Sequence, residues 1–254
     1  MSTADSTPAV DWVSARFTVG NPRLRLICLP PAGSGAGAFH AWRPYVPEHL
    51  ELVPVELPGR GSRIDEPVPD DLDALVEALL HGLEPELNLP YALFGHSFGA
   101  VVAYELALRI ERAGLRPPSA LLASASRAPH LPLMREPISA GSDDELIAWL
   151  LSTGGLPREL LAFPDFLSDL LTAVRGDLAL AEGYVIPHPV AVSCPLFTLA
   201  GEDDTVAPVA QVRPWAAYTP AEHRTRVLPG GHSFPGTHPR QTMSAVLDSL
   251  PALR

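Results

Sequence analysis

The segment YALFGHSFGAVVAYELA, residues 91–107, passes from a short apolar run into a helical pattern with only Gly-His-Ser-Phe-Gly between them. The run before this motif has the length and composition of a buried strand, and the residues after it have the three-and-four spacing of a packed helix. A serine at such a junction must lie in a sharp turn, and Gly95 and Gly99 leave room for it. Ser97 is therefore either a nucleophile raised above a sheet edge or the residue that caps the next helix.

Short apolar runs of strand length recur along the chain and alternate with helical patterns. This alternation indicates an α/β fold with a mostly parallel central sheet and helices on both faces. We expect strands at residues 24–29, 51–57, 91–95, 120–125, 195–201 and 224–230. We expect helices at residues 39–48, 70–87, 98–114, 208–218 and 238–250. Gly114 and then Pro117 mark the end of the third helix, because neither residue continues a helix well.

The span from residue 127 to 189 interrupts the alternation, because it contains several short helical patterns and no strand pattern. A helical insertion above the carboxyl edge of a sheet is typical of a lid or a substrate-pocket wall. The length of 254 residues and the hydrophobic content of 46% fit one large domain that covers residues 1–254. Within it, the polar residues 1–15 are expected to be loose.

The charged residues and cysteines exclude several classes of function. All 18 basic residues are arginine, which excludes a Schiff-base lysine and a lysine-containing phosphate loop. The formal net charge of -11 argues against nucleic acid as a partner, because binding it needs a basic face. Cys28 and Cys194 lie singly in apolar runs, which suggests neither a disulfide nor a metal site. No signal peptide and no apolar run of about 18 to 20 residues is visible, so we expect a cytoplasmic protein outside the membrane.

A serine hydroxyl needs a base to act as a nucleophile at neutral pH. The carboxylates and histidines later in the chain therefore decide whether Ser97 is interpreted as a nucleophile or as a helix cap. Glu202, Asp203 and Asp204 follow one expected strand, and His232 follows the last one. Serine, acid and histidine in this order, at one sheet edge, is the arrangement of the α/β-hydrolases. We favour Asp204 because a Gly-x-x-Asp loop followed by an apolar residue and a proline is typical of them. Asp203 is the alternative acid, and a solvated loop is the alternative to both.

Two other histidines are weaker candidates for the base. His238 lies before a proline near the start of the last helix, whereas Gly230 and Gly231 give His232 a loop that allows close approach. His96 is expected to pack beneath the sharp turn rather than to titrate in a reaction.

Two backbone N–H groups are candidates for an oxyanion hole. One belongs to Phe98, at the start of the helix that follows the serine. The other belongs to Ala32, in the glycine-rich loop CLPPAGSGAGAF at residues 28–39. The glycine spacing of this loop does not fit a dinucleotide fingerprint, and an ordinary strand-to-helix turn is the alternative.

Five motifs together resemble one enzyme family. They are LPPAGSGAGAFHAWRPYVP, ELPGRGSRIDEP, LFGHSFGAVVAYELA, LAGEDDTVAP and GGHSF, and the resemblance covers residues 22–250. The chain is similar to the type II thioesterases, the free-standing editing enzymes of polyketide and nonribosomal peptide assembly lines. The turn LPGR at residues 57–60 and the segment RGDLALAEGY at residues 175–184 separate this family from lipases and esterases in general.

The resemblance implies an α/β-hydrolase that removes short or aberrant acyl groups from the phosphopantetheine arm of acyl or peptidyl carrier proteins. It implies Ser97 as the nucleophile, Asp204 as the orienting acid and His232 as the base, with the Ala32 and Phe98 amides as the oxyanion hole. No cofactor or metal of the enzyme's own is implied. The carrier protein would be a transient partner, and we expect a monomer.

Three other functions remain open at this point. They are a chain-terminating thioesterase domain, a generic esterase and a non-catalytic protein that binds a ligand in a hydrolase-fold pocket. Carrier proteins are acidic, so docking to a chain of net charge -11 would need local arginines. Arg127, Arg135, Arg158 and Arg175 lie in or near the expected lid and are candidates, with a solvated surface role as the alternative.

Overall fold

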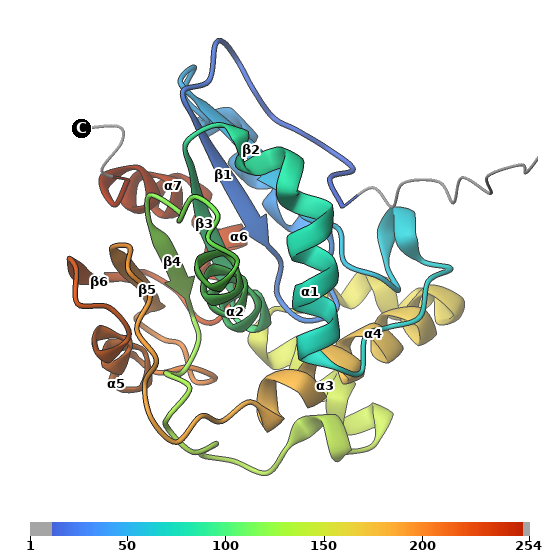
Figure 1. Ribbon diagram of the computed structural model, residues 1–254. Coiled ribbons are helices and arrows are strands. Elements are labelled where there is room, and N and C mark those ends of the chain that lie inside the picture. The colour runs from blue at the N-terminus through green and yellow to red at the C-terminus, as the bar shows by residue number, and fades with distance from the viewer. Residues whose placement is uncertain (1–11, 251–254) are drawn as a thin grey trace, which may run out of the picture.

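The computed structural model describes residues 12–250, in which six strands form one sheet in the order β2-β1-β3-β4-β5-β6 (Figure 1). Every neighbouring pair of these strands is parallel. The strands are β1 (Leu24–Leu29), β2 (Leu50–Pro54), β3 (Tyr91–His96), β4 (Leu121–Ser124), β5 (Leu196–Gly201) and β6 (His223–Leu228). The predicted parallel sheet is confirmed, and only β2 ends clearly earlier than expected.

Helices cover both faces of the sheet (Figure 1). The α-helices outside the segment between β4 and β5 are α1 (Leu72–Leu83), α2 (Phe98–Arg112), α5 (Val209–Val212), α6 (Phe234–Thr237) and α7 (Pro239–Asp248). The 3-10 helices in these parts are η1 (Ala36–Tyr45), η2 (Gly61–Arg63), η3 (Glu84–Asn88) and η6 (Arg213–Tyr218). The expected end of α2 is confirmed, since Gly114 takes a left-handed φ of 69°.

Two expected helices differ from regular α-helices. The segment predicted at 39–48 is the 3-10 helix η1, and the segment predicted at 208–218 is the short α5 followed by the 3-10 helix η6. Each contains a proline, Pro44 in η1 and Pro214 in η6. Proline has no N–H for the i to i−4 bond, so an α-helix cannot continue regularly through it.

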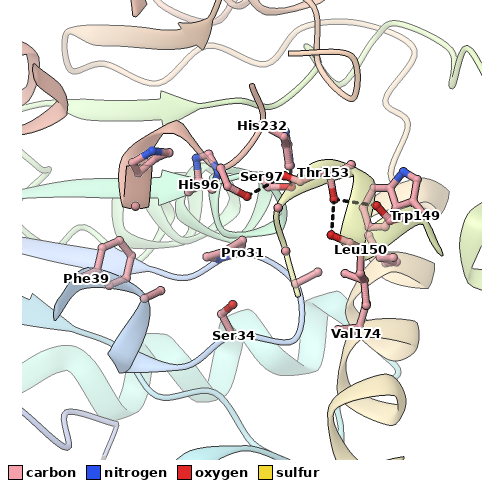
Figure 2. Close-up of a pocket in the computed structure, with 18 residues that line it drawn as sticks. Pro31, Ser34, Phe39, His96, Ser97, Trp149, Leu150, Thr153, Val174 and His232 are labelled. Atoms are coloured by element: carbon pink, nitrogen blue, oxygen red, sulfur yellow. Dashed lines mark hydrogen bonds between the residues drawn. The ribbon is translucent and has the colours of Figure 1, made fainter. Parts of the chain in front are cut away.

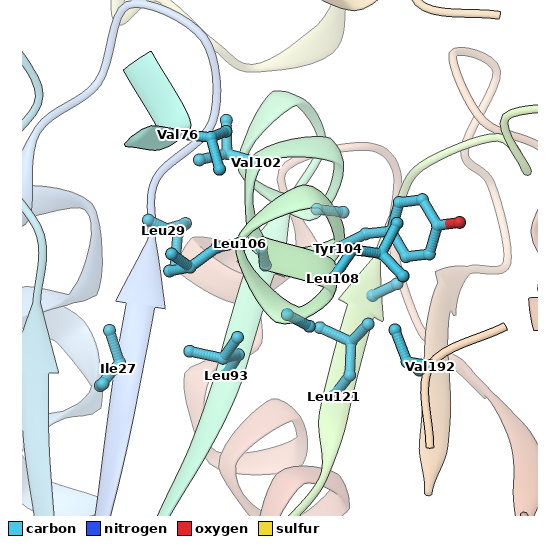
Figure 3. Close-up of a cluster of buried hydrophobic side chains, with 14 of the residues drawn as sticks. Ile27, Leu29, Val76, Leu93, Val102, Tyr104, Leu106, Leu108, Leu121 and Val192 are labelled. Carbon is cyan, nitrogen blue, oxygen red and sulfur yellow. The ribbon is translucent and has the colours of Figure 1, made fainter. Parts of the chain in front are cut away.

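Successive residues of the central strands point to opposite faces, and both faces are buried. In β1, Leu26 and Cys28 belong to the core that contains Trp42, whereas Ile27 and Leu29 belong to the core under α1 and α2. Figure 3 shows the second of these cores, in which β1 and β3 pack against α2. Burial on both faces explains why the strand sequences read as continuous apolar runs rather than as alternating ones.

The start of the described chain contradicts part of the expectation for residues 1–15. Residues 1–11 lie outside the described range. Trp12, however, is only 6% exposed, and a Cβ at Gly82 of α1 would lie 2.0 Å from its ring. The guanidinium carbon of Arg63 lies 3.9 Å from the centre of the same ring. A glycine-sized hollow on α1 and a cation–π contact therefore hold this tryptophan, which polar composition alone did not reveal.

The segment between β4 and β5 is helical, as expected for residues 127–189, and no strand occurs among these described residues. It contains η4 (Ile138–Ala140), α3 (Asp143–Thr153), η5 (Arg158–Ala162) and α4 (Pro164–Gly183). Its helices share a small apolar core of Leu146, Leu150, Leu156, Leu171, Val174 and Leu178. Figure 1 shows α3 and α4 beyond the arrowheads of β1 and β4, at the carboxyl edge of the sheet, and we call this segment the lid.

Candidate active site

Ser97 lies in a strained turn between β3 and α2. Its φ of 55° and ψ of -117° are unusual for a residue with a side chain, and its hydroxyl makes no capping bond to the helix. A backbone conformation of this kind costs about 1–3 kcal/mol and persists only where the surroundings fix it. The two flanking glycines allow the turn: a Cβ at Gly95 would lie 2.0 Å from the Gly99 carbonyl oxygen, and a Cβ at Gly99 would lie 2.2 Å from the Leu29 carbonyl oxygen. Ser97 therefore occupies the N-cap position of α2 but does not cap the helix through its side chain.

The structure brings together Ser97, His232 and Asp204, the three residues predicted to be the nucleophile, the base and the orienting acid. His232 Nε2 lies 3.0 Å from Ser97 Oγ, and His232 Nδ1 lies 2.9 Å from Asp204 Oδ2. Asp203 is exposed, and His238 bonds to its neighbour Thr237, so neither alternative belongs to this chain of hydrogen bonds. The arrangement is what a hydroxyl needs in order to lose its proton to a histidine that a carboxylate orients.

Asp204 is fixed by donors on both of its oxygens. Oδ1 accepts the backbone N–H groups of Val206 at 2.8 Å and Ala207 at 3.0 Å, which leaves Oδ2 for His232. Burial alone would raise the pKa of Asp204, but the hydrogen bond and charge of His232 and the two amides outweigh it, so the pKa is lowered. Asp204 is therefore held as a carboxylate that can stabilise a protonated His232.

His96 packs beneath the turn, as predicted. Its Nδ1 lies 3.0 Å from Ser124 Oγ, and its ring centre lies 5.3 Å from that of His232. Burial, helped by the charge of the neighbouring His232, lowers the pKa of His96 to about 3. His96 is therefore neutral and supports the site through packing.

A cavity of about 200 Å³ opens at Ser97 (Figure 2). Figure 2 shows Phe39 on one side of it and Trp149 with Leu150 of the lid on the other. A second cavity of about 70 Å³ also borders Ser97. Trp149 and Leu178, both from the lid, line the two cavities at once, so they stand at the boundary between them.

The two candidate oxyanion residues border the serine from different elements. Ala32 lines the larger cavity together with Ser97, and Phe98 lines the smaller one. The close approach of Gly99 to the carbonyl oxygens of Leu29 and Pro30 presses the start of α2 against the start of the loop that carries Ala32. Donation by these two amides to an oxyanion remains a prediction.

Three of the four arginines considered for carrier docking have internal partners. Arg127 donates to the carbonyl oxygens of Leu131 at 2.6 Å and Tyr184 at 3.0 Å. Arg175 pairs with Asp143, and Arg135 pairs with Glu182. These three side chains hold the lid together, which the sequence could not show because their partners are distant or are backbone atoms. Arg158 is exposed.

Within residues 12–250, no three His, Cys, Asp or Glu side chains gather as metal ligands would. Cys28 and Cys194 are free and buried, and burial raises the pKa of each thiol. The same part of the chain contains no helix that combines the length and apolar character needed to cross a bilayer.

Known proteins of one family resemble this chain over most of its length. The model of the thioesterase domain family matches residues 24–250. Gramicidin S biosynthesis protein GrsT from Aneurinibacillus migulanus is 31% identical, over 84% of this chain and 83% of GrsT.

Two solved structures are also similar. The type II thioesterase BorB from the borrelidin biosynthetic cluster superposes with a TM-score of 0.83 at 32% identity, over 96% of this chain and 98% of BorB. The RedJ thioesterase from the prodiginine pathway of Streptomyces coelicolor gives a TM-score of 0.81 at 35% identity, over 89% of this chain and 85% of RedJ. The chain therefore belongs to the thioesterase domain family of the α/β-hydrolase fold and is a serine hydrolase that acts on thioesters.

Proposed function

We propose that this protein hydrolyses short or aberrant acyl groups from the phosphopantetheine arm of an acyl or peptidyl carrier protein. The observation that carries the proposal is the hydrogen-bonded chain from Asp204 through His232 to Ser97, placed where two cavities meet. The named pathways of BorB, RedJ and GrsT, which produce natural products, support a carrier-bound substrate.

In the first half of the reaction, His232 Nε2 takes the hydroxyl proton of Ser97 while Oγ attacks the thioester carbonyl carbon. The carbonyl oxygen becomes an oxyanion, which the N–H groups of Ala32 and Phe98 would stabilise. The carbon–sulfur bond then breaks, and the proton on Nε2 passes to the departing pantetheine sulfur. An acyl group remains on Ser97.

In the second half, a water molecule gives a proton to His232 Nε2 as its oxygen attacks the acyl carbonyl carbon. The bond to Ser97 Oγ breaks, Oγ recovers the proton, and the free acid leaves. Asp204 accepts a hydrogen bond from the Nδ1–H group of His232 throughout and stays ionised, which keeps Nε2 directed at Ser97.

The shape of the site favours a short acyl group. The larger cavity takes the acyl chain because its wall includes the apolar side chains of Phe39, Leu150 and Val174. The smaller cavity, which also borders Ser97, is left for the pantetheine arm. We further propose that the enzyme acts as a cytoplasmic monomer and meets its carrier only transiently.

A panel of carrier proteins loaded with different acyl groups tests this function, with mass spectrometry before and after treatment and Ser97→Ala as the control. We expect loss of short acyl groups with the wild type and none with the variant. Release of full-length chains, often cyclised, would instead indicate a chain-terminating enzyme. A preference for simple esters would indicate a generic esterase, and unchanged hydrolysis by Ser97→Ala would remove the serine assignment.

A further inference from the structure

The turn that follows β2 and the helix α4 meet through a buried ion pair. Arg60, from the LPGR turn, donates to both carboxylate oxygens of Asp177 on α4, with Nη2 lying 3.1 Å from Oδ1. Arg60 is 5% exposed and Asp177 is 0% exposed. Replacing a buried pair of this kind by apolar residues is often neutral or stabilising. Stability alone therefore does not explain why these charges are placed here.

Asp177 has a second partner, which lies in the loop after β1. Its Oδ2 accepts the backbone N–H of Gly33 at 2.8 Å. Gly33 directly follows Ala32, whose amide is the candidate oxyanion donor. Because Arg60 holds both carboxylate oxygens, the acceptor for Gly33 is fixed in direction as well as in charge.

The same loop is pressed against α4 and anchored at its far end. Gly33 has a left-handed φ of 71°, and a Cβ there would lie 2.0 Å from Val174 Cγ2. Further along the loop, the Ala36 N–H donates to Glu56 Oε1 at 3.3 Å. The conformation around Ala32 therefore depends on a helix of the lid on one side and on Glu56 on the other.

The side of α4 that holds the loop also forms the cavity wall. Val174 and Leu178, four residues apart on α4, line the larger cavity, and Asp177 lies three residues after Val174 and so on a neighbouring part of the helix surface. If α4 leaves this position, the cavity wall and the acceptor for Gly33 are lost together. The helix α4 therefore both forms part of the wall of the acyl cavity and supports the oxyanion loop.

We propose that Asp177, oriented by Arg60, is a positioning residue that holds the Ala32 amide toward the oxyanion only while α4 is seated on the site. This inference rests on the proposed function, since it assumes that Ser97 attacks a thioester beside Ala32. Hydrolysis is thereby coupled to the position of the lid helix. A substrate that keeps α4 from seating is cleaved slowly even when it reaches Ser97.

An oxyanion donor acts mainly in the transition state, and loss of one lowers turnover by about 10²- to 10³-fold. Loss of its support leaves the amide present but poorly placed, so we expect Asp177→Asn to lower kcat by about 10- to 100-fold with KM nearly unchanged. Binding of a boronic acid that mimics the tetrahedral intermediate weakens by a similar factor. Binding of a thioether analogue of the substrate does not.

The test compares wild type, Asp177→Asn and the apolar pair Arg60→Met with Asp177→Leu, using a short acyl thioester of N-acetylcysteamine. The apolar pair keeps the site filled without charge, so it tests positioning in a folded protein. Asp169→Asn is the matched control, because it removes an exposed carboxylate from the same helix, away from the oxyanion loop. Melting temperature and circular dichroism report folding.

We expect lower kcat in both Asp177 variants and wild-type kcat in the control. A kcat within about twofold of wild type in either folded Asp177 variant would overturn the proposal, as would an equal loss in Asp169→Asn. Weakened thioether binding in place of weakened boronic acid binding would also overturn it. Failure of the proposed function gives a different result from failure of this inference, because thioester hydrolysis would then persist in the Ser97→Ala variant.

Discussion

Replacing Asp204 by asparagine should inactivate the enzyme by giving His232 the wrong tautomer. The backbone N–H groups of Val206 and Ala207 donate to Oδ1 at 2.8 and 3.0 Å. An asparagine must keep its only acceptor, the carbonyl oxygen, toward these two donors. Its NH2 group then faces His232 Nδ1, 2.9 Å away in the wild type, and donates to it.

A nitrogen that accepts a hydrogen bond carries no proton, so the single proton of a neutral His232 moves to Nε2. Nε2, which lies 3.0 Å from Ser97 Oγ, can no longer accept the hydroxyl proton. The same substitution in a serine protease triad lowers kcat by about 10⁴-fold, which corresponds to about 5.5 kcal/mol in the activation barrier. KM should change little, because Asp204 is 4% exposed and does not border the larger cavity.

The assay follows release of free thiol from an acyl N-acetylcysteamine thioester under saturating conditions. Asp203→Asn is the matched control, since it makes the same chemical change at the exposed neighbouring position and should keep wild-type turnover. The reasoning would be refuted by a folded Asp204→Asn enzyme that retains more than a tenth of wild-type kcat. A larger loss in Asp203→Asn than in Asp204→Asn would refute it equally.

Three further changes have defined outcomes. Gly99→Ala should lower the melting temperature and abolish activity, because its Cβ would lie 2.2 Å from the Leu29 carbonyl oxygen; a stable, active variant would contradict the tight turn. Trp149→Ala should raise kcat/KM for long acyl chains relative to short ones severalfold by enlarging the cavity proposed to take the acyl group, and an unchanged chain-length profile would show that Trp149 does not limit its length. The lowered pKa of Asp204 means that its charge stabilises the fold above the unfolded value of 3.8 and that this contribution is lost as pH falls through the folded pKa. Urea midpoints should therefore fall more steeply in acid for wild type than for Asp204→Asn, and parallel curves would contradict this.

The sequence predicted the parts of the fold and site that depend on local pattern. Strands buried on both faces have continuous apolar runs, and all six were placed within a few residues. The serine, acid and histidine follow three of these strands, so their meeting at one edge follows from parallel topology. The N-terminal tryptophan escaped prediction because the hollow at Gly82 that receives it is a tertiary feature.

The pair Arg60 and Asp177 shows a different limit. Both segments were singled out in the sequence, but the two residues are 117 positions apart. Neither segment contains a pattern that predicts contact with the other. A single buried ion pair produces no periodic pattern in the sequence, and an arginine in a loop is normally predicted to be exposed. The internal partners of Arg127 and Arg175 escaped prediction for the same reason, since both side chains bond mainly to backbone carbonyls that the fold of the lid brings near. Docking of a carrier protein by the four arginines remains a prediction.

The strand order explains why the lid must cover the serine. β3, which ends directly before Ser97, is separated from β5, which precedes Asp204, by β4 alone. Two strand spacings are about 10 Å, and the His232 ring with a hydrogen bond on each side bridges the side chains across that gap. β4 fills the gap below: its last residue, Ser124, accepts the Ser97 N–H at 2.8 Å and contacts His96. The chain leaves the sheet at this point to form the lid, so an insertion after β4 begins beside the nucleophile and any movement of it alters access to Ser97.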